Sequence, residues 1–181
     1  FRVALFLGLV ALAQAATKID LIGKDFYAYY DVVELSDGPA LRVKMVYENY
    51  NIGWFGSEGD GTKGMYMSVA LGGLQMEGTN MIACGLSYYN SPTDSFTCEE
   101  GLLVGYSPPR SHFLHQNNEL TWTTDKVEYA GAESRFEFTF IRKFDYGDAI
   151  PEAYKIEEGD LKIIHATGQF REGRIRNHGG Q

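Results

Sequence analysis

Alternation of apolar and polar residues is the feature of this sequence that most restricts its fold. Every second residue from 41 to 47 is apolar, and Phe136, Phe138 and Phe140 repeat the same pattern. A period of two places alternate side chains on opposite faces of a β-strand. We therefore expect strands at residues 26–35, 41–48, 65–71, 81–88, 96–106, 119–123, 126–129, 135–144 and 161–170.

Turn-forming residues separate these runs at short intervals. Ser-Asp-Gly-Pro occupies 36–39, Asn-Ser-Pro-Thr-Asp occupies 90–94, and residues 52–64 form a long glycine-rich loop. About nine short strands with turns every ~8–12 residues are typical of an antiparallel β-sandwich or barrel. We expect residues 16–181 to form one all-β domain, an antiparallel β-sandwich.

The first fifteen residues have the organisation of a secretory signal peptide. Arg2 precedes an apolar run from Val3 to Ala13, and the small residues at 13–15 provide a cleavage site before Ala16. The run of about eleven residues is shorter than the ~20 that cross a bilayer as a helix. A buried first strand is the alternative interpretation. We expect secretion of a mature chain with no transmembrane segment, because no second apolar stretch approaches that length.

The charge balance limits the range of partners. The chain has 16 basic and 24 acidic residues, a net charge of −8 and an isoelectric point near 5.0. Nucleic acids and anionic membrane surfaces attract clustered Lys and Arg, so both are excluded as expected partners.

The two cysteines are expected to form a disulfide. Cys84 and Cys98 are the only cysteines, and each lies in a β-type run beside the turn at 90–94. An even cysteine count in a secreted chain favours a disulfide, and a link across a hairpin is sterically natural.

Motifs of catalysis do not stand out, so an enzyme is not expected. The sequence has no Gly-x-Ser-x-Gly, no His-Glu-x-x-His and no phosphate-binding loop. His112 and His115 lie three apart in a polar loop, a weak ion site or a solvated pair. His165 lies within an apolar run and His178 beyond the last expected strand.

Met76 differs from the other methionines. Met65, Met67 and Met81 lie in expected strands, where methionine usually fills the core. Met76 follows Gly72 and Gly73 in a turn with no obvious core to fill. A thioether and an imidazole are both ligands of haem iron in electron-carrying proteins.

Six segments, in order, give the chain a resemblance to the DOMON family, which includes the cytochrome domain of cellobiose dehydrogenases. In that family, a strand that ends in Gly is followed by a Met, a small residue, Gly and then Asp or Asn. After these come a middle turn, an Arg-containing strand with an Asp-rich exit, an apolar-x-Ala-x-Gly strand and a terminal His-Gly. The matching segments are 70–73 (Ala-Leu-Gly-Gly), 76–81 (Met-Glu-Gly-Thr-Asn-Met), 105–109 (Gly-Tyr-Ser-Pro-Pro), 138–148, 163–168 (Ile-Ile-His-Ala-Thr-Gly) and 177–179 (Asn-His-Gly).

The resemblance covers about 26–180 and implies an immunoglobulin-like β-sandwich that holds haem b at one end. It implies Met76 and His178 as axial ligands, with His165 as the alternative to His178 and with Met81 and His165 beside the cofactor. The chain departs from the family at His165, where Trp is common, and at Glu77, which adds a charge beside the ligand turn.

With both axial positions filled, the resemblance implies electron transfer rather than oxygen chemistry. The redox partner is then a flavoprotein, a membrane cytochrome or a small reductant. Two alternatives stay open. One is a haem-free module that binds a glycan or another ligand, with Trp54 as an aromatic platform. The other is a structural or adhesive extracellular subunit that self-assembles through exposed edge strands.

Overall fold

The computed structural model describes residues 16–22, 24–51, 63–72, 79–87, 95–102, 120–149, 154–157, 162–171 and 174–175. These residues form ten strands and two single-turn 3-10 helices, η2 (Gly131–Glu133) and η3 (Gly147–Ala149). The strands are β1 (Thr17–Ile22), β2 (Phe26–Leu35), β3 (Gly38–Tyr50), β4 (Lys63–Leu71), β5 (Asn80–Ser87), β6 (Ser95–Leu102), β7 (Thr121–Glu128), β8 (Ser134–Lys143), β9 (Ile163–Arg171) and β10 (Arg174–Ile175).

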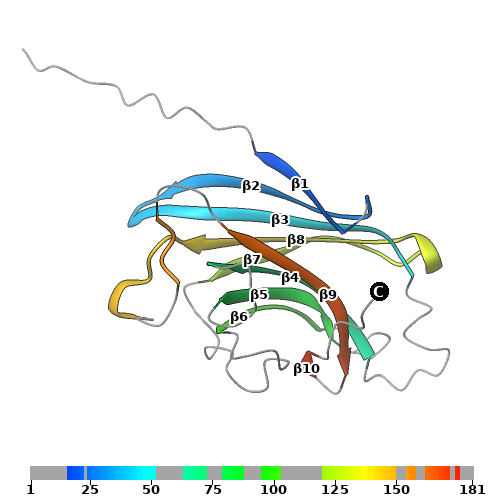
Figure 1. Cartoon of the computed structure of the whole chain (residues 1–181). Helices are drawn as coiled ribbons and strands as arrows, with labels where there is room; N and C mark the ends of the chain where they lie inside the picture. The colour runs from blue at the N-terminus through cyan, green and yellow to red at the C-terminus, as the bar shows by residue number, and fades with distance from the viewer. Residues whose placement is uncertain are drawn as a thin grey trace, which may run out of the picture.

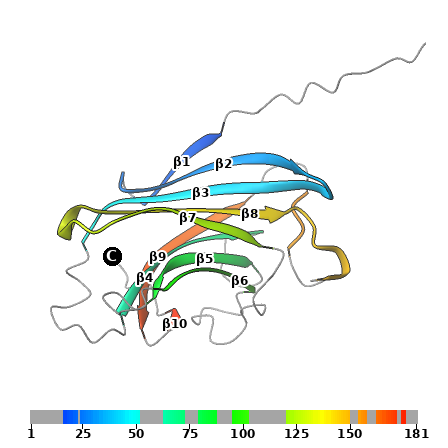
Figure 2. The ribbon, with the colours of Figure 1, turned by 180° about the vertical axis from the view of Figure 1, so that it is seen from behind.

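Two antiparallel sheets of five strands each pack face to face, as Figure 1 shows. Sheet A has the order β1-β2-β3-β8-β7, and sheet B has the order β10-β9-β4-β5-β6. Figure 2 shows the same two layers from behind. In sheet A, β8 lies between β3 and β7; in sheet B, β9 lies between β10 and β4. The expected all-β antiparallel sandwich is confirmed.

The core lies between the two sheets, where the alternating residues face one another. Sheet A contributes the three phenylalanines of β8 together with Phe26, Val43 and Met45; sheet B contributes Met65, Met67, Val69, Ile82 and Leu86. All of these side chains are fully buried. The period-two pattern of β3 and β8 therefore identified the inward face of sheet A correctly.

Three strands differ from the expectation, and one of them is β10, which lies in the stretch expected to be a tail after the last strand. The structure has an edge strand, β1, that the sequence analysis did not predict, because its residues are mostly exposed and show no strong alternation. The expected strands 119–123 and 126–129 are one strand, β7, whose pairing with β8 shifts between Thr124 and Lys126. A bulge at that point lets one strand continue through an irregular pattern.

Candidate functional site

Several predicted residues lie outside the described part of the chain. Met76, His178 and Trp54 are among them, as are His112 and His115. The structure does describe the points from which the first two depart. Gly72 and Thr79 flank the connection 73–78 that contains Met76, and Ile175 in β10 lies three residues before His178.

Sheet B is buried on both of its faces. Its inward face packs in the core. The opposite side, here called the outward face of sheet B, consists mainly of small residues and also carries the larger Tyr66 and Met81. Tyr66, Ala70, Met81 and Ala83 are at most 5% exposed, and Ile164 and Ala166 pack against them. In register the rows of this face are Gly101–Met81–Ala70–Ile164, Glu99–Ala83–Ser68–Ala166 and Thr97–Gly85–Tyr66–Gly168.

The aromatic ring of Tyr66 lies across the neighbouring strand. A Cβ atom at Gly168 would lie 2.7 Å from the Tyr66 ring, so only glycine leaves room for it there. Burial raises the pKa of Tyr66 to about 12, so its hydroxyl stays protonated at neutral pH. The β4 and β5 part of the outward face of sheet B is therefore buried and mainly apolar.

Glu99 places a carboxyl group on this face. It pairs in register with Ala83, and burial raises its pKa above the ordinary value. The described residues offer it no ion-pair partner. A carboxyl group in such surroundings takes up a proton more readily than one in water.

Met81 and His165 project from opposite faces of sheet B, so the structure does not bring these two predicted cofactor contacts together. Met81 pairs with Ala70 on the outward face, whereas His165 pairs with the core residue Val69. The His165 ring packs edge to face on the Phe26 ring, with 6.3 Å between the two ring centroids. His165 also forms a hydrogen bond with the backbone of Leu21 in sheet A. Partial burial lowers the pKa of His165, and the bond to Leu21 opposes the shift.

Cys84 and Cys98 form the expected disulfide. The two residues face each other directly across the β5–β6 ladder and their side chains lie in the core. The prediction of a link across this hairpin is confirmed.

A closed ring of hydrogen bonds lies at the end of the sandwich where β4 ends and β5 begins. Arg142 Nε donates to Glu100 Oε1 at 2.9 Å, and Asn80 Nδ2 donates to the same oxygen at 3.0 Å. The ring closes through Tyr154, whose N–H donates to Asn80 Oδ1 and whose carbonyl accepts from Arg142 Nη2. Tyr146 adds a bond to Glu100 Oε2 at 2.6 Å.

This polar ring is withdrawn from water and joins both sheets. Arg142 is on β8 of sheet A, and Asn80 and Glu100 are on β5 and β6 of sheet B; all three are at most 1% exposed. The sequence analysis noted Arg142 only as the arginine of the matched segment 138–148, and it did not single out Glu100. An arginine at an inward position of the β8 alternation, after Phe136, Phe138 and Phe140, was the available signal, because a buried charge requires a partner.

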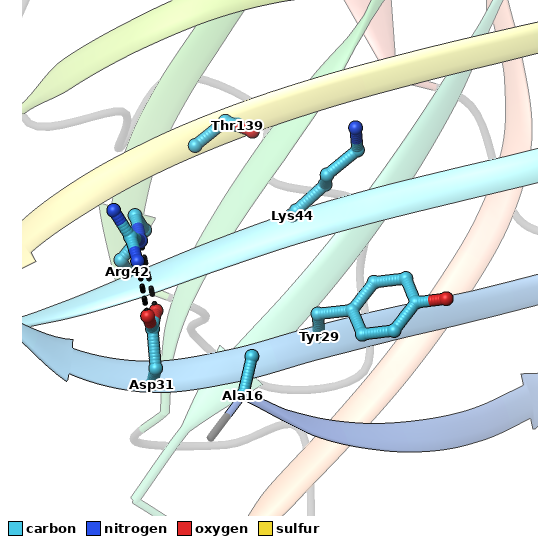
Figure 3. Close-up of a pocket in the computed structure, with 6 residues that line it drawn as sticks. All are labelled: Ala16, Tyr29, Asp31, Arg42, Lys44 and Thr139. Carbon is cyan, nitrogen blue, oxygen red and sulfur yellow. Dashed lines mark hydrogen bonds and ion pairs between the residues drawn. The ribbon is translucent and has the colours of Figure 1, made fainter. Parts of the chain in front are cut away.

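Sheet A carries a different feature on its outward face, shown in Figure 3. A shallow depression of about 350 Å³ is lined by Ala16, Tyr29, Asp31, Arg42, Lys44 and Thr139. Arg42 binds Asp31 with two parallel hydrogen bonds, and Lys44 Nζ lies 2.6 Å from Glu137 Oε2. Burial alone would raise the pKa of Glu137, but bonds from Lys44 and Arg135 outweigh it and lower that pKa. The depression thus presents paired charges beside one aromatic ring.

Two general features complete the description. The residues described contain no group of three or more His, Cys, Asp or Glu side chains placed to hold a metal ion. In the same residues, no helix has the length and apolar character needed to cross a membrane. No protein-family model, curated protein or solved structure matches the chain.

Proposed function

We propose that the chain is a secreted electron-transfer module that binds haem b on the outward face of sheet B, with Met76 and His178 as axial ligands. The observation that carries the proposal is this face itself. Its β4 and β5 part is mainly apolar and buried, and the two segments that contain the ligands depart from opposite ends of the sheet.

The reach of the chain is compatible with this arrangement. Leu71 and Gly64, at the two ends of β4, are separated by seven residue steps, about 23 Å of extended strand. Met76 lies three residues before Thr79, and His178 lies three residues after Ile175, so each backbone spans at most about 10 Å. The proposal requires the two side chains to cover the remaining distance.

The residues of this face fit a flat apolar cofactor. Ala70 and Ala83 are at most 4% exposed and Ala166 packs against them, so this face offers a cofactor a mainly apolar surface. When bound between a thioether and an imidazole, haem exchanges single electrons and keeps no open position for oxygen. Glu99 contributes a carboxyl group that resists ionisation. These roles support a carrier that serves a flavoprotein, a membrane cytochrome or a small reductant.

Absorption spectroscopy of the secreted protein tests the proposal. We expect a Soret band in the protein as purified or after addition of haemin. Met76→Ala should remove the far-red band of sulfur-ligated ferric haem, and His178→Ala should abolish tight haem retention. Met67→Leu and His165→Gln are the matched controls, because both residues are on the inward face. Absence of a Soret band, or spectra unchanged in both ligand variants, would overturn the proposal.

The depression on sheet A supports a second candidate function, the binding of a neutral glycan. Tyr29 offers an aromatic ring beside the Asp31–Arg42 pair, which provides both acceptors and donors for sugar hydroxyls. We expect retention on neutral polysaccharide columns that Tyr29→Ala removes and Tyr129→Ala, on an exposed residue elsewhere, leaves unchanged. Equal retention of both variants would refute this site.

A further inference from the structure

Strand β1 forms one margin of sheet A and offers its outer side to a further strand. Among the strands that the structure describes, only β2 pairs with it, and Figure 1 and Figure 2 both show β1 at the rim of the sheet. We propose that β1 of one copy of the chain pairs antiparallel with β1 of a second copy, which joins two sheets A into one continuous sheet. Dimer formation of this kind requires no cofactor, so it stands apart from the proposed function.

The outer side of β1 is open to solvent. Residues 16–20 are all exposed, and the side chains of Lys18 and Asp20 are 46% and 60% exposed. An edge strand of an antiparallel sheet leaves the N–H and C=O groups of alternate residues without strand partners. A second strand therefore satisfies these backbone groups along β1.

Ile19 lies at the centre of β1 and continues a row of core residues to the edge of the sheet. In register the row is Ile19–Ala28–Met45–Phe138. The last three side chains are fully buried, whereas Ile19 is 40% exposed. Pairing of two β1 strands about this residue places Ile19 directly opposite Ile19 of the other copy. The contact covers apolar surface that a single copy exposes to water.

The charges on either side of Ile19 make β1 complementary to itself. Lys18 lies in register with Tyr29, which lines the depression on the outward face of sheet A, and Asp20 follows on the same face. In an antiparallel pair centred on Ile19, Lys18 of each copy lies opposite Asp20 of the other. Opposite charges at facing positions stabilise a strand pair. The Lys18–Asp20 contact of 3.1 Å within one copy is exposed, so it exchanges readily for the contact between copies.

The same two charges disfavour the other registers. A slip that centres the pair on residue 18 sets Lys18 against Lys18, and a slip that centres it on residue 20 sets Asp20 against Asp20. Like charges at facing positions destabilise a strand pair. A slip by one position pairs residues that point to opposite faces. Only the register centred on Ile19 matches both the charges and the apolar row.

The opposite edge strand of sheet A, β7, is less suited to pairing. Its ladder with β8 is interrupted between Thr124 and Lys126, in the middle of the strand. In β1 the corresponding irregularity lies between Asp20 and Ile22, at the end of the strand. Bulges and lysines on an edge strand discourage further pairing. Two copies related by a two-fold axis through β1 close on themselves, so we expect dimers rather than fibres.

Analytical ultracentrifugation of the purified protein over a range of concentrations tests the proposal. A short strand pair buries little surface, so we expect a dissociation constant between about 10 µM and 1 mM. Ile19→Lys sets two lysines against each other at the centre of the pair and should raise this constant about tenfold or more. Val32→Lys is the matched control, because Val32 is a 45% exposed aliphatic residue of the same sheet that lies beyond the end of β1.

Exchanged charges test the register. Lys18→Glu makes both facing positions acidic and Asp20→Lys makes both basic, so we expect neither variant to dimerise alone. An equimolar mixture of the two should form a heterodimer, because every acidic residue then lies opposite a lysine.

Three results would count against the pair. A wild-type protein that stays monomeric up to about 1 mM would overturn the proposal, because β1 then takes no second copy. Dimers that Ile19→Lys leaves unaltered would overturn it as well, because they would use another surface. Association of each charge variant alone, as strong as that of the wild type, would refute the register.

Discussion

Sheet A presents a face of charged residues to solvent, whereas sheet B keeps both of its faces buried. On sheet A the partners Arg42 and Asp31 lie across neighbouring strands, and the Arg42 side chain is 48% exposed. On sheet B the outward residues of β4 and β5 are mainly apolar and buried. The charged side chain that sheet B contributes to the polar ring, Glu100, is fully buried with Arg142.

The two faces differ in whether their ion pairs hold the surrounding residues in one arrangement. Exposed ion pairs exchange readily with water and salt, so they keep a sheet face soluble at little energetic gain. A buried pair has no alternative partner in water, so it holds its surroundings in one arrangement. Sheet A therefore resembles an ordinary solvated layer on its outward face, whereas the charged residue of sheet B in the polar ring is held by a buried partner.

The largest expected effect comes from breaking the buried pair that joins the two sheets. Arg142→Met removes the basic partner of the buried Glu100 carboxyl group, and we expect a loss of about 3–5 kcal/mol in the free energy of unfolding. Urea denaturation measures it. A loss below that of Arg42→Met would show that the buried pair contributes nothing special.

Reduction of the disulfide should have the second largest effect, and only sheet B contains one. Cys84 and Cys98 are 14 residues apart in the sequence. A disulfide that closes a loop of this length stabilises the folded state by about 3 kcal/mol. Thermal unfolding with and without a reductant provides the measurement. Since the link also ties β5 to β6, we expect Cys84→Ala/Cys98→Ala to accelerate hydrogen exchange in sheet B more than in sheet A.

Two matched substitutions by a larger residue compare the outward faces of the two sheets directly. Ala83→Leu adds bulk to a residue that is 1% exposed, and we expect a loss of about 1–3 kcal/mol together with weaker haem uptake. Thr121→Leu adds bulk on the exposed side of β7 and should change stability by less than about 0.5 kcal/mol. Equal effects would mean that the two faces do not differ in packing.

The smallest effect is expected on the exposed pair of sheet A. Arg42→Met should cost only about 0.2–1 kcal/mol, because water and salt screen this partner of Asp31. The difference from wild type should shrink further in high salt. Denaturation at two salt concentrations checks this. A loss of stability above that range that does not depend on salt would show that the Asp31–Arg42 pair contributes more than an exposed ion pair.

Alternation and turn chemistry were enough to predict the sandwich and most of its strands, because each strand of sheet A shows its inward face in its own residues. The same pattern understated sheet B. Residues such as Ser68, Ala70 and Ala83 are small enough to read as solvent-facing positions, although they are buried. Whether a small residue is covered depends on what packs over it, and local sequence does not contain that information.

The sequence by itself determined the antiparallel β fold and the disulfide between Cys84 and Cys98. The axial ligands Met76 and His178, which the family resemblance implies, stay a prediction. Periodicity, cysteine count and local motifs are properties of neighbouring residues, so they can be recognised along the chain. Only the tertiary structure decided that Met81 and His165 lie on opposite faces of sheet B. It also joined Asn80, Glu100 and Arg142, which are up to 62 residues apart, because only the packing of two sheets brings their strand ends together.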